Sequence, residues 1–133
     1  MLDCLILGDS IGVGVSQVRK ECSAIVKGGI NSWQFNKNNS GEFFSSTVII
    51  SLGANDHKGV NTRKELENLR SRVVAKNRVF WILPAIKPEI REIIKDIATK
   101  NGDYIIERPK DHMSADGIHP TGRGYKIIGE QTK

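Results

Sequence analysis

The stretch Leu-Asp-Cys-Leu-Ile-Leu-Gly-Asp-Ser-Ile-Gly-Val-Gly at residues 2–14 sets the pattern that decides the fold. Its first part, residues 2–7, is short and mostly apolar, which is typical of a strand buried on both faces of a sheet. The run stops at Gly8. A helix is expected from Gly12 to Glu21, although its two early glycines weaken its beginning. This stretch therefore predicts a strand, a polar turn and a helix in succession.

The same succession recurs along the rest of the chain. Further strands are predicted at residues 23–26, 47–52, 79–83 and 104–106. The run Thr-Val-Ile-Ile-Ser-Leu at residues 47–52 is the clearest of them because of its β-branched side chains. Helices are predicted at residues 62–76, 88–101 and 120–130. The first of these has Thr62 as its expected N-cap, with Glu65 three residues later. Its apolar stripe is Leu66, Leu69, Val73 and Val74.

Five strands alternating with helices predict an α/β fold with a parallel sheet between two layers of helices. Right-handed crossovers leave few topologies for such a chain, and a flavodoxin-like five-stranded order is the expected one. The composition shows no break, so residues 1–133 are expected to form one domain. In such sheets ligands bind beyond the carboxyl ends of the strands, which directs attention to the loops that follow them.

Composition excludes several classes of protein. The 133 residues are 38% hydrophobic and 26% charged, which fits neither a disordered tail nor a membrane protein. No apolar run approaches the roughly 20 residues that a spanning helix needs. The net charge of +5 is spread along the chain, and aromatic residues are only 6% of it. Since base stacking needs aromatic side chains, no nucleic-acid partner is expected.

The two cysteines, Cys4 and Cys22, suggest no disulfide framework, and both are expected to be reduced thiols in the core. No Cys/His spacing resembles a zinc site, so neither a metal nor a cofactor is expected. The first residues carry an acid, Asp3, where a secretory signal carries a base. A cytoplasmic location is therefore expected, with later release or attachment to a larger particle left open.

The loop after the first strand holds a candidate catalytic serine. Ser10 follows a strand and precedes a helix, where backbone N–H groups and the helix dipole stabilise negative charge. A phosphate cradle is the alternative, but the segment fits neither a dinucleotide fingerprint nor a P-loop. Near the other end, Asp116 and His119 lie three residues apart on a turn. The carboxylate can hold the imidazole tautomer and leave Nε2 free for a serine hydroxyl.

Two further loops carry polar groups. Residues 28–33 read Gly-Gly-Ile-Asn-Ser-Trp, which indicates either a turn that caps a short helix or a glycine N–H donated into a site. Residues 53–56 read Gly-Ala-Asn-Asp, which indicates either a plain turn or an Asn55 amide directed at an oxyanion.

Taken together and in order, these four segments resemble the blocks of the SGNH hydrolases, also called the GDSL esterase/lipase family, over nearly the whole chain. By that resemblance Ser10 is the nucleophile, His119 the general base and Asp116 the residue that orients it. The oxyanion hole is the Ser10 N–H, the Gly29 N–H and the Asn55 side chain, with Gly28 as the adjacent alternative to Gly29. The resemblance implies an α/β/α sandwich and a serine esterase.

The substrate expected is a small-molecule or carbohydrate ester, with acetyl groups favoured because so short a chain leaves little length for lids or an acyl channel. Trp33, Asp56 and Pro84 are the expected substrate contacts, Trp33 by stacking on a sugar ring. A thioesterase or lysophospholipase of the same family is one alternative. A non-catalytic α/β module that binds a ligand at the same strand ends is the other.

Overall fold

The computed structural model describes residues 3–133, and its centre is a sheet of five parallel strands in the order β2-β1-β3-β4-β5. The strands are β1 (Cys4–Gly8), β2 (Ser23–Val26), β3 (Phe43–Ser51), β4 (Val73–Ile82) and β5 (Tyr104–Ile106). The expected α/β fold with a flavodoxin-like sheet is confirmed. Leu2, which was expected in the first strand, lies outside the described residues.

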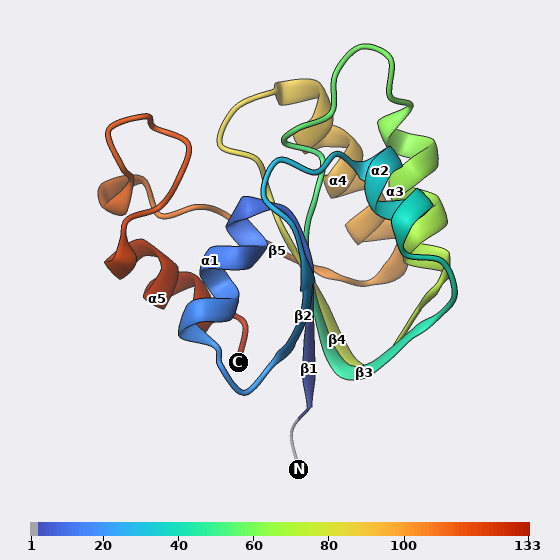
Figure 1. Ribbon diagram of the computed structural model, residues 1–133, viewed down its shortest axis with the longest axis horizontal. Coiled ribbons are helices and arrows are strands. Elements are labelled where there is room, and N and C mark those ends of the chain that lie inside the picture. Colours follow the sequence, from blue (N-terminus) through green and yellow to red (C-terminus); the bar gives the residue numbers. More distant parts are fainter. Residues whose placement is uncertain (1–2) are drawn as a thin grey trace.

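Helices cover both faces of the sheet, as Figure 1 shows with the sheet seen nearly edge-on. The five α-helices are α1 (Ser10–Val18), α2 (Ser32–Asn38), α3 (Thr62–Ser71), α4 (Pro88–Asn101) and α5 (Gly122–Gln131). A short 3-10 helix, η1 (Lys110–His112), precedes α5. Helices α1 and α5 pack together on one face, while α2, α3 and α4 lie on the other. In residues 3–133 no helix is long and apolar enough to cross a membrane.

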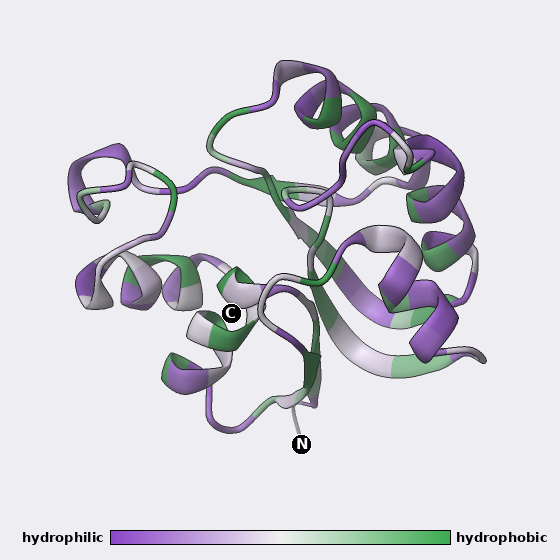
Figure 2. Ribbon diagram, turned by 45° about the horizontal axis from the view of Figure 1, so that its top comes forward, coloured by the Kyte–Doolittle hydropathy of each residue, from purple (hydrophilic) through white to green (hydrophobic). Residues whose placement is uncertain are grey.

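Each face of the sheet closes over its own apolar core. The larger core lies under α2, α3 and α4 and includes the fully buried Trp81. The smaller lies under α1 and α5 and includes Ile6, Ile49 and Ile128. Hydrophobic residues follow the central strands, and the helices turn hydrophilic residues outward (Figure 2). The sheet is therefore buried on both faces. Because the strands are parallel, their carboxyl ends lie together at one edge of the sheet, and the loops that follow them can carry polar functional side chains.

Several element boundaries differ from those predicted, among them the start of β3 at Phe43 and the start of α5 at Gly122. Helix α3 ends at Ser71, and Val73 and Val74 begin strand β4 instead of completing its apolar stripe. Pairing with the long β3 explains this, because Phe43 and Phe44 face Val73 and Val74 across the sheet. The N-cap of α3 is Asn61 in place of Thr62, and its side chain accepts a hydrogen bond from the Lys64 N–H. Helix α1 begins at Ser10, two residues before the expected start.

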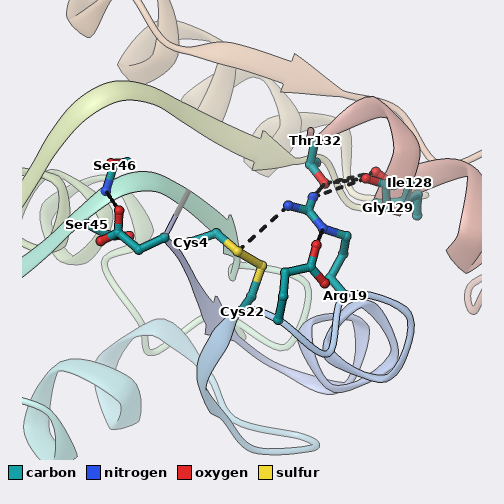
Figure 3. Close-up of a disulfide and its surroundings, with 10 residues drawn as sticks. Cys4, Arg19, Cys22, Ser45, Ser46, Ile128, Gly129 and Thr132 are labelled. Atoms are coloured by element: carbon teal, nitrogen blue, oxygen red, sulfur yellow. Dashed lines mark hydrogen bonds and ion pairs between the residues drawn. A yellow bond between two sulfur atoms is a disulfide. The ribbon is translucent and has the colours of Figure 1, made fainter. Parts of the chain in front are cut away.

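The expectation of reduced cysteines is wrong. Cys4 on β1 and Cys22 just before β2 form a disulfide that closes a loop with a sequence separation of 18 residues (Figure 3). Parallel pairing of β1 with β2 brings the two residues together, since Leu5 lies opposite Ser23. Closing a loop of this length constrains the unfolded chain and stabilises the fold by about 3 kcal/mol. Arg19 lies beside the bridge, and its Nη2 donates a hydrogen bond of 3.7 Å to the Cys4 Sγ (Figure 3).

Candidate active site

Ser10 lies at the junction of β1 and α1, where it is the first residue of the helix. Asp9 caps this helix with a side chain that accepts from the Ile11 N–H at 3.0 Å. The Ser51 hydroxyl at the end of β3 donates to the same carboxylate oxygen, also at 3.0 Å. These contacts tie the turn to the neighbouring strand, so that the Ser10 hydroxyl is held at the positive end of the α1 dipole.

His119 and Asp116 lie on a tight loop that leads into α5. The Ser114 N–H donates to the His119 carbonyl at 2.7 Å, and Met113 pairs with Pro120, so the loop closes on itself as a small hairpin. Within it the Asp116 Oδ1 accepts from the backbone N–H groups of Ile118 and His119, at 2.8 and 2.9 Å. The positions of both side chains are therefore set by the backbone of the loop.

The structure brings the three predicted catalytic side chains into one line. The Ser10 Oγ lies 3.1 Å from the His119 Nε2, although the two residues are 109 positions apart in sequence. The His119 Nδ1 lies 2.7 Å from the Asp116 Oδ2. In this arrangement the carboxylate accepts the Nδ1–H, which leaves Nε2 as the acceptor for the serine hydroxyl. Such a line of contacts can move a proton away from Ser10.

The pKa values of two carboxylates near these contacts are shifted in opposite directions. The hydrogen bond from the His119 side chain, with help from two backbone N–H groups, lowers the pKa of Asp116 to about 2. Asp116 is therefore charged at neutral pH and suited to face an imidazolium. Burial raises the pKa of Asp9, against the hydrogen bonds from Ser51 and Ile11. The Asp9 Oδ2 is buried without a hydrogen-bond partner in the described residues.

A small hollow of about 220 Å³ opens beside Ser10 and His119. Asn55, from the loop after β3, and Pro84, from the loop after β4, line it as well. The Asn55 Nδ2 donates one hydrogen bond of 3.1 Å to the Ile30 carbonyl. An amide nitrogen carries two hydrogens, so the second is available for a ligand in the hollow. We call this space the catalytic hollow.

Gly29 is not brought to the catalytic hollow. The turn of Gly28 and Gly29 lines a separate hollow with Lys27 and Gln34. The next backbone donors along the chain are occupied within the fold, since the Asn31 N–H donates to the Gln34 Oε1 and the Ser32 N–H to the Asp56 Oδ1. Neither glycine of the second block lines the catalytic hollow. Of the residues expected to form the oxyanion hole, Ser10 and Asn55 line the catalytic hollow.

Two of the three expected substrate contacts lie elsewhere. Asp56 is only 4% exposed, and its oxygens accept from the Ser32 N–H, the Ser32 hydroxyl and the Thr62 hydroxyl. Its role is to fasten the starts of α2 and α3 to each other. Trp33 is 48% exposed on α2, with the Lys37 ammonium 4.9 Å from its ring centre, and it does not line the catalytic hollow. Pro84 alone of the three lines it.

Sequence reasoning missed two cationic side chains that line the catalytic hollow, Lys87 and Arg108. Lys87 has a left-handed backbone, with φ of 67°, and its Nζ donates to the Asp56 carbonyl at 2.8 Å. Strained backbone of this kind gathers at functional sites. Arg108 follows β5 by two residues and is 6% exposed. The sequence signal that could have found both residues is their position, because each lies in a loop that follows the carboxyl end of a strand.

Comparisons with known proteins agree with this description of the fold. No family model matches the chain, and no curated protein matches it in sequence. Among solved structures, a lipolytic protein of the G-D-S-L family from Veillonella parvula superposes with a TM-score of 0.68 at 17% identity, over 98% of this chain and 96% of that one. A GDSL-like lipase from Bacteroides thetaiotaomicron superposes with a TM-score of 0.64 at 19% identity, over 96% of this chain and 84% of that one.

A third similar structure is the C-terminal catalytic domain of a Streptococcus pneumoniae peptidoglycan O-acetyltransferase. It gives a TM-score of 0.59 at 15% identity, over 97% of this chain and 89% of that one. All three cover nearly the whole chain described above. The fold is that of the SGNH, or GDSL, hydrolases, as the four sequence segments predicted.

Proposed function

We propose that this chain is a serine esterase of the SGNH type, working as one domain and needing neither metal nor cofactor. The observation that carries the proposal is the pair of contacts from the Ser10 Oγ to the His119 Nε2, 3.1 Å, and from the His119 Nδ1 to the Asp116 carboxylate, 2.7 Å. A module that only binds a ligand has no need of a nucleophile, a base and an orienting acid in line. The alternative of a non-catalytic module is therefore the weaker one.

In the first half of the reaction, the Ser10 Oγ attacks the ester carbonyl carbon while its proton passes to the His119 Nε2. The negative charge that forms on the carbonyl oxygen is held by the Ser10 N–H and the Asn55 amide. The carbon–oxygen bond to the alcohol then breaks, and the imidazolium gives its proton to the leaving alcohol oxygen. An acyl-serine remains.

In the second half, water takes the place of the alcohol. His119 accepts a proton from this water as its oxygen attacks the acyl carbon. The bond to the Ser10 Oγ breaks, the proton returns to that oxygen, and the carboxylic acid leaves. Asp116 keeps its negative charge throughout and stabilises the imidazolium in both halves.

The substrate that we favour is an acetyl or other short-acyl ester on a carbohydrate. A catalytic hollow of about 220 Å³ is small for a long acyl chain. The similarity to a catalytic domain whose name is peptidoglycan O-acetyltransferase also favours acetyl groups and a sugar polymer. Because Trp33 lies outside the hollow, sugar contacts would come from the loops after β3 and β4. A thioesterase or lysophospholipase is the alternative if acyl chains are long.

Replacing the nucleophile tests the proposal directly. Ser10→Ala should abolish hydrolysis of p-nitrophenyl acetate, because no other group at the β1–α1 turn carries a hydroxyl directed at His119. The loss of one part-buried hydroxyl should change the free energy of unfolding by less than about 1 kcal/mol. Ser16→Ala on the same helix is the matched control, since the Ser16 hydroxyl bonds only the Val13 carbonyl. Hydrolysis that persists in Ser10→Ala would assign the nucleophile to another residue.

The cytoplasmic location stays a prediction. The disulfide between Cys4 and Cys22 weighs against it, because such bonds form and persist mainly in oxidising surroundings. Later release, which the sequence left open, is consistent with this bond.

A further inference from the structure

A second and larger hollow adjoins the catalytic hollow. Its volume is about 550 Å³, and it lies between the loop after β4, the loop after β5 and the start of η1. The two hollows share three lining residues, namely Ala85, Ile86 and Arg108. A substrate whose acyl group occupies the catalytic hollow can therefore extend its alcohol part into this neighbour. We call the larger space the side hollow.

Arg108 lies where the two hollows meet and has donors to spare. It is 6% exposed, and its Nη1 donates to the Ile118 carbonyl at 2.7 Å. Its Nε is buried without a partner, and its Nη2 makes no hydrogen bond within residues 3–133. Burial lowers the pKa of this guanidinium, and the nearby Asp9 opposes that shift without forming a direct ion pair. A buried guanidinium with unfilled donors gains more from an anion than an exposed one does.

The charges around the side hollow are mostly positive. Arg91 is held in place, because it donates to the Pro84 carbonyl at 2.6 Å and to the Glu107 carboxylate at 2.7 Å. Glu107 is the one acid that lines the side hollow in the described part of the chain. Lys110 is exposed and takes part in no ion pair among the described residues. Besides the Arg91–Glu107 pair, the lining holds two further cations, Arg108 and Lys110, which can attract an anion, while Asp9 and Asp116 act on Arg108 from outside this lining.

The other walls of the side hollow are apolar. Ala85, Ile86, Pro88 and Met113 line it, and Ile86 is 56% exposed. Apolar walls suit the carbon frame of a ring, while the cations suit a charged group attached to it. The side hollow thus combines the two kinds of contact that an organic carboxylate needs.

On the basis of the proposed esterase function, we propose that the side hollow binds a carboxylate carried by the alcohol part of the ester. Arg108 receives the carboxylate at the junction of the two hollows, and Lys110 adds attraction from the rim. The substrate class becomes an acetyl ester of a hydroxylated acid, such as a sugar that bears a carboxylate. These residues select the substrate and take no part in bond breaking.

Two acetyl esters, one with a free carboxylate and one in which that carboxylate is a methyl ester, test this inference. The probes are 4-acetoxybenzoate and its methyl ester, and the quantity is the ratio of kcat/KM for the acid to kcat/KM for the methyl ester. Dividing each variant's ratio by that of the wild type removes the difference in leaving-group reactivity. Lys110→Glu should lower the ratio about tenfold, the effect of losing one charge-assisted interaction, mainly by raising KM for the acid. Arg108→Gln should lower it at least as much.

Lys100→Glu is the matched control. It makes the same change in net charge at an exposed lysine in the last turn of α4, about 14 Å along the helix from Arg91, the nearest residue of α4 that lines the side hollow. Its ratio, and its hydrolysis of p-nitrophenyl acetate, should equal those of the wild type. If Arg108→Gln fails to fold, as judged by circular dichroism, Lys110→Glu decides alone.

The inference is overturned if the ratio in Lys110→Glu stays at the wild-type value, or if Lys100→Glu lowers it equally. Either result would leave the esterase proposal standing, because that depends on Ser10-dependent hydrolysis of p-nitrophenyl acetate. Absence of that hydrolysis would overturn the esterase proposal itself.

Discussion

At the scale of single residues, the proposed chemistry depends on which groups can hold and pass a proton. The Asp116 carboxylate accepts three hydrogen bonds from two residues of its own loop, Ile118 and His119. It keeps its charge because these donors favour the ionised form. Asp9, one residue before Ser10, has the opposite tendency because it is buried. Asp9 and Asp116 thus have the same side chain, and their surroundings shift its pKa in opposite directions.

The pH dependence of the rate follows from this difference. With the pKa of Asp116 lowered to about 2, mainly by the hydrogen bond from His119, its carboxylate is already charged above roughly pH 4. The rate should therefore rise with pH along one acid limb that does not belong to Asp116, because a general base acts only in its unprotonated form. A profile of kcat/KM for p-nitrophenyl acetate measures this. A limb with a slope of two protons would contradict a single titrating base.

Asn55 is expected to act on the transition state more than on the bound ester. Asn55→Ala should lower kcat roughly 100-fold and leave KM nearly unchanged, because the amide meets an oxygen that becomes charged only during reaction. Asn39→Ala is the control, since the Asn39 Nδ2 also donates to a backbone carbonyl, that of Phe35, away from the site. A rise in KM alone would make Asn55 a residue that positions the substrate.

At the scale of elements, the site depends on how closely α1 and α5 approach. Gly14 of α1 faces Tyr125 of α5, and a Cβ at position 14 would collide with the tyrosine ring. The loop that carries His119 leads directly into α5, while Ser10 begins α1. The distance between these two helices therefore also sets the distance between nucleophile and base.

Gly14→Ala should destabilise the protein by about 1–3 kcal/mol, the usual cost of overpacking a tight contact. On a solvent-exposed face of a helix, the same change would stabilise the protein by up to about 1 kcal/mol. A destabilising effect would therefore indicate that the contact between α1 and α5 is tight at this position. Urea unfolding measures it. Gly28→Ala is the control because a Cβ there meets nothing within 4 Å. A Gly14→Ala protein as stable as the wild type would mean that the two helices can separate at little cost.

At the scale of the whole molecule, the volumes of the two hollows limit which substrates the site can hold. The catalytic hollow holds about 220 Å³, and its walls come from the loops after β1, β3, β4 and β5. The side hollow, which is proposed to take the alcohol part of the ester, therefore has a larger volume than the catalytic hollow, which is proposed to take the acyl group.

Short acyl chains should accordingly be preferred. Burying a methylene normally contributes about 0.8 kcal/mol, and a small hollow forgoes most of this gain for chains of roughly eight carbons or more. A series of p-nitrophenyl esters from acetate to laurate provides the measurement. If kcat/KM climbed steadily with chain length, a real acyl channel would exist, and a thioesterase or lysophospholipase would replace the acetyl esterase as the best assignment.

The order of the five strands and of four of the five α-helices followed from the sequence because apolar runs and helical periodicity are local signals, while α2 was left open between a turn and a short helix. Ser10, Asn55, Asp116 and His119 could be named for the same reason, since each lies in a short segment at a predicted strand or helix end. The sequence was less informative where pairing partners decide the outcome. Val73 and Val74 fit the stripe of a helix, but they pair with Phe43 and Phe44 of β3 in the sheet.

What the sequence by itself determined is the layered α/β fold and the four polar loops at one edge of its sheet, because periodicity and turn residues act over a few positions. Only the tertiary structure decided which loop residues meet. It joined Cys4 to Cys22, separated Gly29 and Trp33 from the catalytic hollow, and buried Asp56 between α2 and α3. It also placed Arg108 at the junction of two hollows. Contacts of this kind depend on packing between distant segments, which no local pattern records.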